Sequence, residues 1–87
     1  MVSNNIFISA DLWVVKNPGE MKAFAKHLRQ IRVEHNLSQQ ELADEADIAK
    51  VTLQRIELSK RGLTLDMFIS LAKALDVSPN ELLQYMK

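Results

Sequence analysis

The side chains that could take part in chemistry in this sequence are mostly charged, and they fall in blocks of one sign. Residues 22–32 and 50–61 are predominantly basic, whereas residues 41–47 are acidic. The blocks contain Lys22, Lys26, Arg29 and Arg32, then Glu41, Asp44, Glu45 and Asp47, and finally Lys50, Arg55, Lys60 and Arg61 against Glu57 alone. Such blocks are typical of solvated helix faces that pair with one another, and also of a surface that attracts a polyanion. The charges alone leave both interpretations open.

Residues suited to catalysis or metal binding are scarce. The chain has no Cys, and its two His residues, His27 and His35, lie more than two helical turns apart with no acidic residue in register to complete a ligand set. The two glycines cannot form a phosphate-cradling loop, and no nucleophile elbow surrounds a serine. We therefore expect no enzyme activity, no metal and no cofactor.

The composition indicates one small domain with an apolar core. The chain has 87 residues, with 11 Lys and Arg against 11 Asp and Glu, and 47% of its residues are hydrophobic. A chain of this length can hold a hydrophobic core without disulfides or metal. No apolar run approaches the roughly 18 residues that a membrane span needs, and Met1–Lys16 lacks the basic start of a secretory signal. We expect a cytoplasmic protein with no membrane partner.

Capping and turn residues divide residues 17–87 into five helices. Gly occurs only at 19 and 62 and Pro only at 18 and 79, and from residue 18 onward no strand-like alternation persists. Asn17, Ser38, Thr64 and Ser78 are suited to cap helices, and Asn36 to end the first helix in the left-handed conformation. The sequence predicts an all-α, compact five-helix bundle with helices over about 18–35, 38–47, 49–58, 64–75 and 78–86.

Residues 1–16 form an N-terminal extension with a different pattern. Ile6-Phe7-Ile8 and Leu12-Trp13-Val14-Val15 are β-branched or aromatic runs that could form one or two short strands. A lone hairpin is only marginally stable. The extension therefore folds back on the helical body, pairs with the same segment of another subunit, or stays mobile, and the sequence does not separate these three cases.

The second and third predicted helices have the features of a helix-turn-helix unit. Both are short, the connection between them is tight, and Ala43 is small where the two helices would cross. On a wheel of about 100° per residue, Leu53 and Ile56 share the inward side of the third helix, while Lys50, Val51, Gln54 and Arg55 spread over the other side. The second helix of such a unit can enter the major groove of DNA, although a generic pair of packed helices satisfies the same pattern.

Longer motifs resemble a known family. From Phe24 to Leu83 the sequence is similar to the Cro/phage-repressor (Xre) helix-turn-helix family in unbroken register, through the motifs Leu28-Arg29-Gln30-Ile31-Arg32, Leu37-Ser38-Gln39-Gln40-Glu41-Leu42-Ala43, Leu53-Gln54-Arg55-Ile56-Glu57 and Leu71-Ala72-Lys73-Ala74-Leu75-Asp76-Val77-Ser78. The resemblance implies a lambda-repressor-like fold and sequence-specific binding of double-stranded DNA, usually as a two-fold homodimer. It also implies transcriptional control and a place on the nucleoid.

The resemblance assigns roles to individual residues. The base edges would be read by residues at the start of the third helix and one turn on, namely Lys50, Val51, Gln54 and Arg55. Phosphates would be held by Ser38, Gln39, Thr52, Lys60 and Arg61. Arg32 and Glu57 match a family pair that ties the first helix to the end of the third, so we expect them to form a structural ion pair.

The sequence departs from the family pattern at the turn. Asp47 stands where the family usually has Gly, and Ala49 where it usually has a capping Ser or Thr. Asp tolerates the left-handed conformation better than most residues, so the turn can still form. The missing capping hydroxyl should cost about 1 kcal/mol. We expect a secure fold with weakened DNA contacts at this point.

Two features leave the partners open. The apolar residues of the fifth helix either form the dimer contact or close the monomer core; they are Leu82, Leu83, Tyr85 and Met86.

The leading hypothesis is a transcriptional regulator of the repressor type. The alternative is a protein-binding module, such as an antitoxin whose residues 1–16 bind a partner toxin. Zero net charge and the apolar extension favour this alternative.

Overall fold

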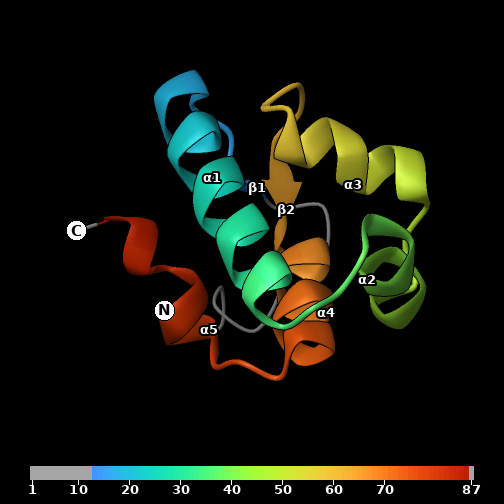
Figure 1. The fold of residues 1–87 in the computed structure, drawn as a ribbon. Helices are drawn as coiled ribbons and strands as arrows, with labels where there is room; N and C mark the ends of the chain where they lie inside the picture. The colour runs from blue at the N-terminus through green and yellow to red at the C-terminus, as the bar shows by residue number, and fades with distance from the viewer. Residues whose placement is uncertain (1–12, 87) are drawn as a thin grey trace, which may run out of the picture.

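A computed structural model of the protein describes residues 13–86, which form a helical body and a small two-stranded sheet (Figure 1). None of the helices in this part of the chain combines the length and apolar character needed to cross a membrane. The elements in order are β1 (Trp13–Val15), α1 (Pro18–Glu34), α2 (Gln39–Ala46), α3 (Lys50–Glu57), β2 (Leu63–Thr64), α4 (Leu65–Leu75), α5 (Pro79–Leu82) and the 3-10 helix η2 (Gln84–Met86).

The helices begin at the residues that the capping signals predicted. The Asn17 side chain accepts hydrogen bonds from the backbone N–H groups of Gly19 and Glu20, at 2.8 and 3.3 Å. The Ser38, Thr64 and Ser78 hydroxyls likewise accept bonds from the backbone N–H three residues on, at the starts of α2, α4 and α5. Each cap satisfies donors that a helix start leaves free, so these predictions are confirmed.

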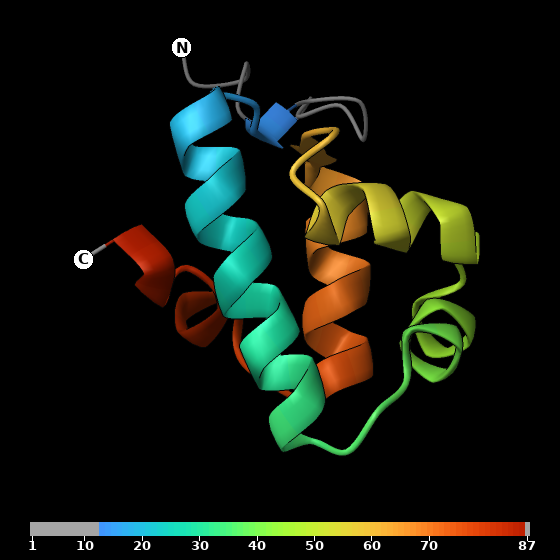
Figure 2. The same ribbon diagram turned by 45° about the horizontal axis from the view of Figure 1, so that its top comes forward.

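The helices pack around one apolar core. Figure 2 shows α2 and α3 on one side of the α1–α4 pair and α5 with η2 on the other. Each helix turns an apolar side inward, and the largest fully buried side chains are Phe24, Leu28, Leu42, Leu53, Leu63, Leu71, Leu75, Leu82 and Val15. Burial of this apolar surface is the main stabilising term for a domain of this size.

The sequence predicted only one strand of the two-stranded sheet, the one in the N-terminal extension. β1 pairs antiparallel with β2, with Trp13 opposite Thr64 and Val15 opposite Leu63. Val15 is 1% exposed and belongs to the core, so this part of the N-terminal extension folds back on the helical body. The prediction of no strand after residue 18 was wrong at β2. The predicted strand at Ile6-Phe7-Ile8 lies outside the described residues.

The end of the chain also differs from the expectation of one fifth helix. α5 stops at Leu82, and the chain continues as the short helix η2. Leu82 is fully buried, while Leu83 and Tyr85 are half-buried against the core, and the Tyr85 ring packs edge-on against Phe24 with centroids 5.3 Å apart. Leu82 therefore lies in the core of its own chain. The side chain of Met86 lies outside what the structure describes.

Candidate nucleic-acid interface

The turn between α2 and α3 forms although it lacks the usual glycine. Asp47 adopts the left-handed conformation with φ 57° and ψ 46°. The backbone N–H of Ile48 then donates to the carbonyl of Ala43 at 3.0 Å, which satisfies an acceptor at the end of α2. The prediction that Asp supports this turn is confirmed, and α2 and α3 are held as a compact helix-turn-helix unit whose facing residues, Leu42, Ala43, Ala46, Leu53 and Ile56, are buried.

The outward side of α3 is open. Lys50, Val51 and Arg55 are exposed, Val51 to 51%, while Gln54 is half-buried. Exposure of an apolar side chain to water is unfavourable in free energy, so a partner that covered Val51 would gain binding energy. The only ion pair among residues 13–86 joins two other residues, so Lys50 and Arg55 carry charges that are not neutralised within this part of the chain.

The start of α3 is less well capped than the other helix starts. Ala49 occupies the cap position with the extended backbone that a cap requires, at φ −69° and ψ 143°, but it makes no side-chain hydrogen bond. Thr52 follows within the first turn and is half-buried. The first N–H groups of α3 thus lack the intramolecular side-chain acceptor that the family pattern would have supplied.

The start of α2 is held by a reciprocal pair of hydrogen bonds. The Ser38 hydroxyl accepts from the Glu41 N–H at 3.0 Å, and the Glu41 carboxylate accepts from the Ser38 N–H at 2.8 Å. The backbone and side-chain bonds from Ser38 lower the pKa of Glu41 below its ordinary value. Ser38 is exposed, and its hydroxyl, which accepts from the Glu41 N–H, can still donate its own hydrogen to a partner.

The loop after α3 carries the remaining basic residues of the predicted set. Ser59 adopts a left-handed conformation at φ 60°, and the Lys60 N–H donates to the Arg55 carbonyl at 2.7 Å. The loop is therefore tied to the last turn of α3. Lys60 is exposed, whereas Arg61 is half-buried and donates through Nε to the Gly62 carbonyl at 3.2 Å.

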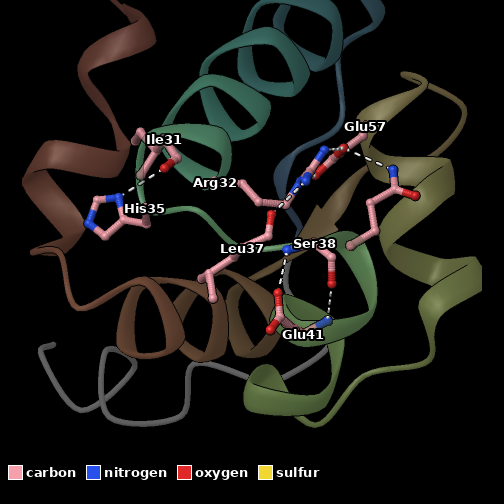
Figure 3. A network of polar contacts seen from close by, with 8 residues as sticks. Ile31, Arg32, His35, Leu37, Ser38, Glu41 and Glu57 are labelled. Carbon is pink, nitrogen blue, oxygen red and sulfur yellow. Dashed lines mark hydrogen bonds and ion pairs between the residues drawn. The ribbon is translucent and has the colours of Figure 1, made fainter.

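The ion pair expected between Arg32 and Glu57 is present (Figure 3). Arg32 Nε donates to Glu57 Oε2 at 2.7 Å, and Nη2 donates to Oε1 at 3.1 Å. The remaining guanidinium nitrogen, Nη1, donates to the Leu37 carbonyl at 2.8 Å. The side chains are 11% and 3% exposed, so this bidentate pair joins α1, the α1–α2 connection and the end of α3 from within the molecule.

Gln39 takes part in this network, which the sequence analysis did not foresee. Its side-chain Nε2 donates to Glu57 Oε1 at 3.0 Å, whereas the resemblance placed Gln39 among the phosphate ligands. Gln39 is half-buried at the first position of α2. No local pattern could have indicated this bond, because it joins residues 18 positions apart on different helices.

In the described part of the chain, both histidine rings lie within hydrogen-bond distance of a backbone carbonyl. A ring nitrogen of His27 lies 3.0 Å from the Glu81 carbonyl, and one of His35 lies 2.9 Å from the Ile31 carbonyl. Within residues 13–86 no three acidic or histidine side chains are placed to hold a metal ion. The exposed cations along α3 and its flanks, Lys50, Arg55 and Lys60, are suited to binding a partner surface.

Comparison with known proteins identifies the family. A helix-turn-helix family model, HTH_3, matches residues 28–82. The chain belongs to the HTH_3 helix-turn-helix family. The match contains α2, the turn, α3, α4 and α5, together with residues 28–34 at the end of α1. HTH_3 proteins are DNA-binding transcriptional regulators, and that is the class of this chain.

Individual HTH_3 relatives are similar over most of their length. The chain is 38% identical over 63 residues to control protein C.BamHI of Bacillus amyloliquefaciens. The aligned residues cover 71% of this chain and 78% of that protein. It is 37% identical over 59 residues to control protein C.SmaI of Serratia marcescens, covering 68% and 70%. The crystal structure of the restriction-modification controller protein C.AhdI of Aeromonas hydrophila superposes with a TM-score of 0.72 at 31% identity, covering 74% of this chain and 97% of that one.

Proposed function

We propose that this protein reads a specific double-stranded DNA sequence with α3 lying in the major groove. The open outward side of α3 carries this proposal, because Lys50, Val51 and Arg55 are exposed and the helix itself is held by its buried side. Arg55 would grip guanine O6 and N7, a contact worth about 1–3 kcal/mol of discrimination. Val51 would meet a thymine methyl group, and Lys50 and Gln54 would serve neighbouring base edges.

The phosphates on either side of the groove would be held by residues that flank α3. These are Ser38 at the start of α2, Thr52 in the first turn of α3, and Lys60 and Arg61 in the following loop. The loop is bonded to the last turn of α3, so its cations keep a set position relative to the reading helix. Phosphate contacts fix register and affinity, whereas base contacts carry the sequence information.

We further propose that two copies act as a homodimer and repress transcription by occupying a promoter. A two-fold dimer would place the two α3 helices about 34 Å apart, on successive major grooves, and would favour a nearly palindromic site. The relatives described as control or controller proteins support a role in controlling a restriction-modification system. A reporter gene behind the recovered site should fall in expression when the chain is supplied; a rise would assign activation instead.

Selection from a random duplex library tests the reading surface directly. At about 100 mM salt, where non-specific binding is weakened, the wild-type chain should recover a motif with a guanine in each half. Arg55→Ala should lose that guanine preference, whereas Arg29→Ala, which removes an exposed arginine on α1, should keep it. Lys60→Ala should weaken binding to all duplexes about equally. A guanine preference that survives Arg55→Ala would show that α3 is not the reader proposed here.

A further inference from the structure

The hydrogen bond between Gln39 and Glu57 joins the two ends of the helix-turn-helix unit that lie farthest from its turn. Gln39 is the first residue of α2, and Glu57 is the last residue of α3. The turn at Asp47 connects the opposite ends of the same helices. Since one end of each helix is joined by the chain and the other by this bond, the bond restricts the angle between α2 and α3.

The acceptor in this bond is itself fixed. The Glu57 carboxylate is 3% exposed and receives two further hydrogen bonds from Arg32, which in turn donates to the Leu37 carbonyl in the connection before α2. Gln39 therefore donates to a charged acceptor that α1 holds in place. To reach a phosphate with its side-chain amide, Gln39 would have to leave a charge-assisted bond to a nearly buried carboxylate.

We propose that Gln39 is a positioning residue, whose bond to Glu57 sets the angle of α3 against α2 and so determines how sharply the protein discriminates between DNA sequences. The inference rests on the proposed function, since it concerns the same α3 surface. Bidentate contacts to base edges are directional and fail when a helix tilts, whereas long cationic side chains can still follow the phosphates. Loss of the bond should therefore reduce specific binding more than non-specific binding.

The test compares two glutamines that are neighbours in the sequence. Gln39→Leu removes the donor to Glu57. Gln40→Leu is the matched control, because Gln40 is exposed and its side chain donates to Asp44 within the same helix, at 2.8 Å. The probes are the duplex that wild-type protein recovers by selection and a random duplex of equal length. Each variant is titrated with both probes, and residual dipolar couplings of its backbone amides are measured without DNA.

For Gln39→Leu we expect affinity for the selected duplex to fall about tenfold, affinity for the random duplex to stay within about twofold, and the couplings of α3 to change relative to those of α1. Gln40→Leu should change neither affinity nor the couplings. Equal losses on both duplexes would make Gln39 a phosphate ligand and overturn the inference, as would no loss on either. If wild-type protein bound all duplexes equally, the proposed function would fail, and unchanged α3 couplings in Gln39→Leu would separately refute the positioning role.

Discussion

Replacing Glu57 with glutamine should strongly destabilise the fold. In Glu57→Gln the Arg32 side chain, 11% exposed, loses its counter-charge and keeps only neutral acceptors, the Leu37 carbonyl and one amide oxygen. The new amide nitrogen must also face a donor, because both carboxylate oxygens of Glu57 accept bonds in the native structure. Removing one partner of a buried pair typically costs 3–5 kcal/mol, and the remaining carbonyl bond places this case at about 3 kcal/mol.

The assay is urea and thermal unfolding followed by circular dichroism. A loss of about 3 kcal/mol corresponds to a fall of roughly 12–24 °C in Tm for a domain of this size. Glu45→Gln is the control, because Glu45 is exposed on α2 and should change stability by no more than about 0.5 kcal/mol. A loss below about 0.5 kcal/mol in Glu57→Gln would mean that the pair behaves as a solvent-exposed one and would refute the reasoning.

Three further substitutions test local geometry. Gly62→Ala should lower the free energy of unfolding by about 1–3 kcal/mol in urea melts, because the added Cβ would overlap the Val15 carbonyl oxygen and lie 3.2 Å from the Trp13 ring; unchanged stability would contradict this packing. Ala49→Ser should raise the free energy of unfolding by about 1 kcal/mol, since α3 gains a capping hydroxyl, and a decrease would show that the hydroxyl does not reach the helix N–H groups. The lowered pKa of Glu41 makes its contribution to stability present above the ordinary carboxyl pKa and lost as pH falls through the folded-state value. Glu41→Gln should therefore flatten the stability profile measured below about pH 5, and an unaltered slope would speak against the Ser38 bonds as its cause.

The helix starts could be predicted because their signals are local. A capping side chain and the N–H that it accepts from lie two or three residues apart. The local sequence was therefore enough to predict the helix starts at Asn17, Ser38, Thr64 and Ser78. The left-handed turn at Asp47 is likewise a property of one residue type at one position. The inward stripe of α3, Leu53 and Ile56, followed from helical periodicity alone.

The parts that escaped prediction depend on residues far apart in the sequence. The strand at Leu63–Thr64 has only two residues and exists as the partner of Trp13–Val15. The hydrogen bond from Gln39 to Glu57 joins α2 to α3, so it forms only when the two helices are packed together. For Leu82, an apolar pattern shows that a side chain avoids water but does not show whether its own core or another molecule covers it.

The burial of Val15 makes the folding unit larger than the stretch that defines the family. A fragment trimmed to residues 28–82 would lose both Val15, the partner of Leu63, and Phe24, whose ring lies 6.4 Å from that of Phe68. Deletion mapping must be interpreted accordingly. If removal of residues 13–15 abolishes DNA binding, the first explanation is that the segment carrying Lys60 and Arg61 has lost its anchor, rather than that the deleted residues touched the duplex.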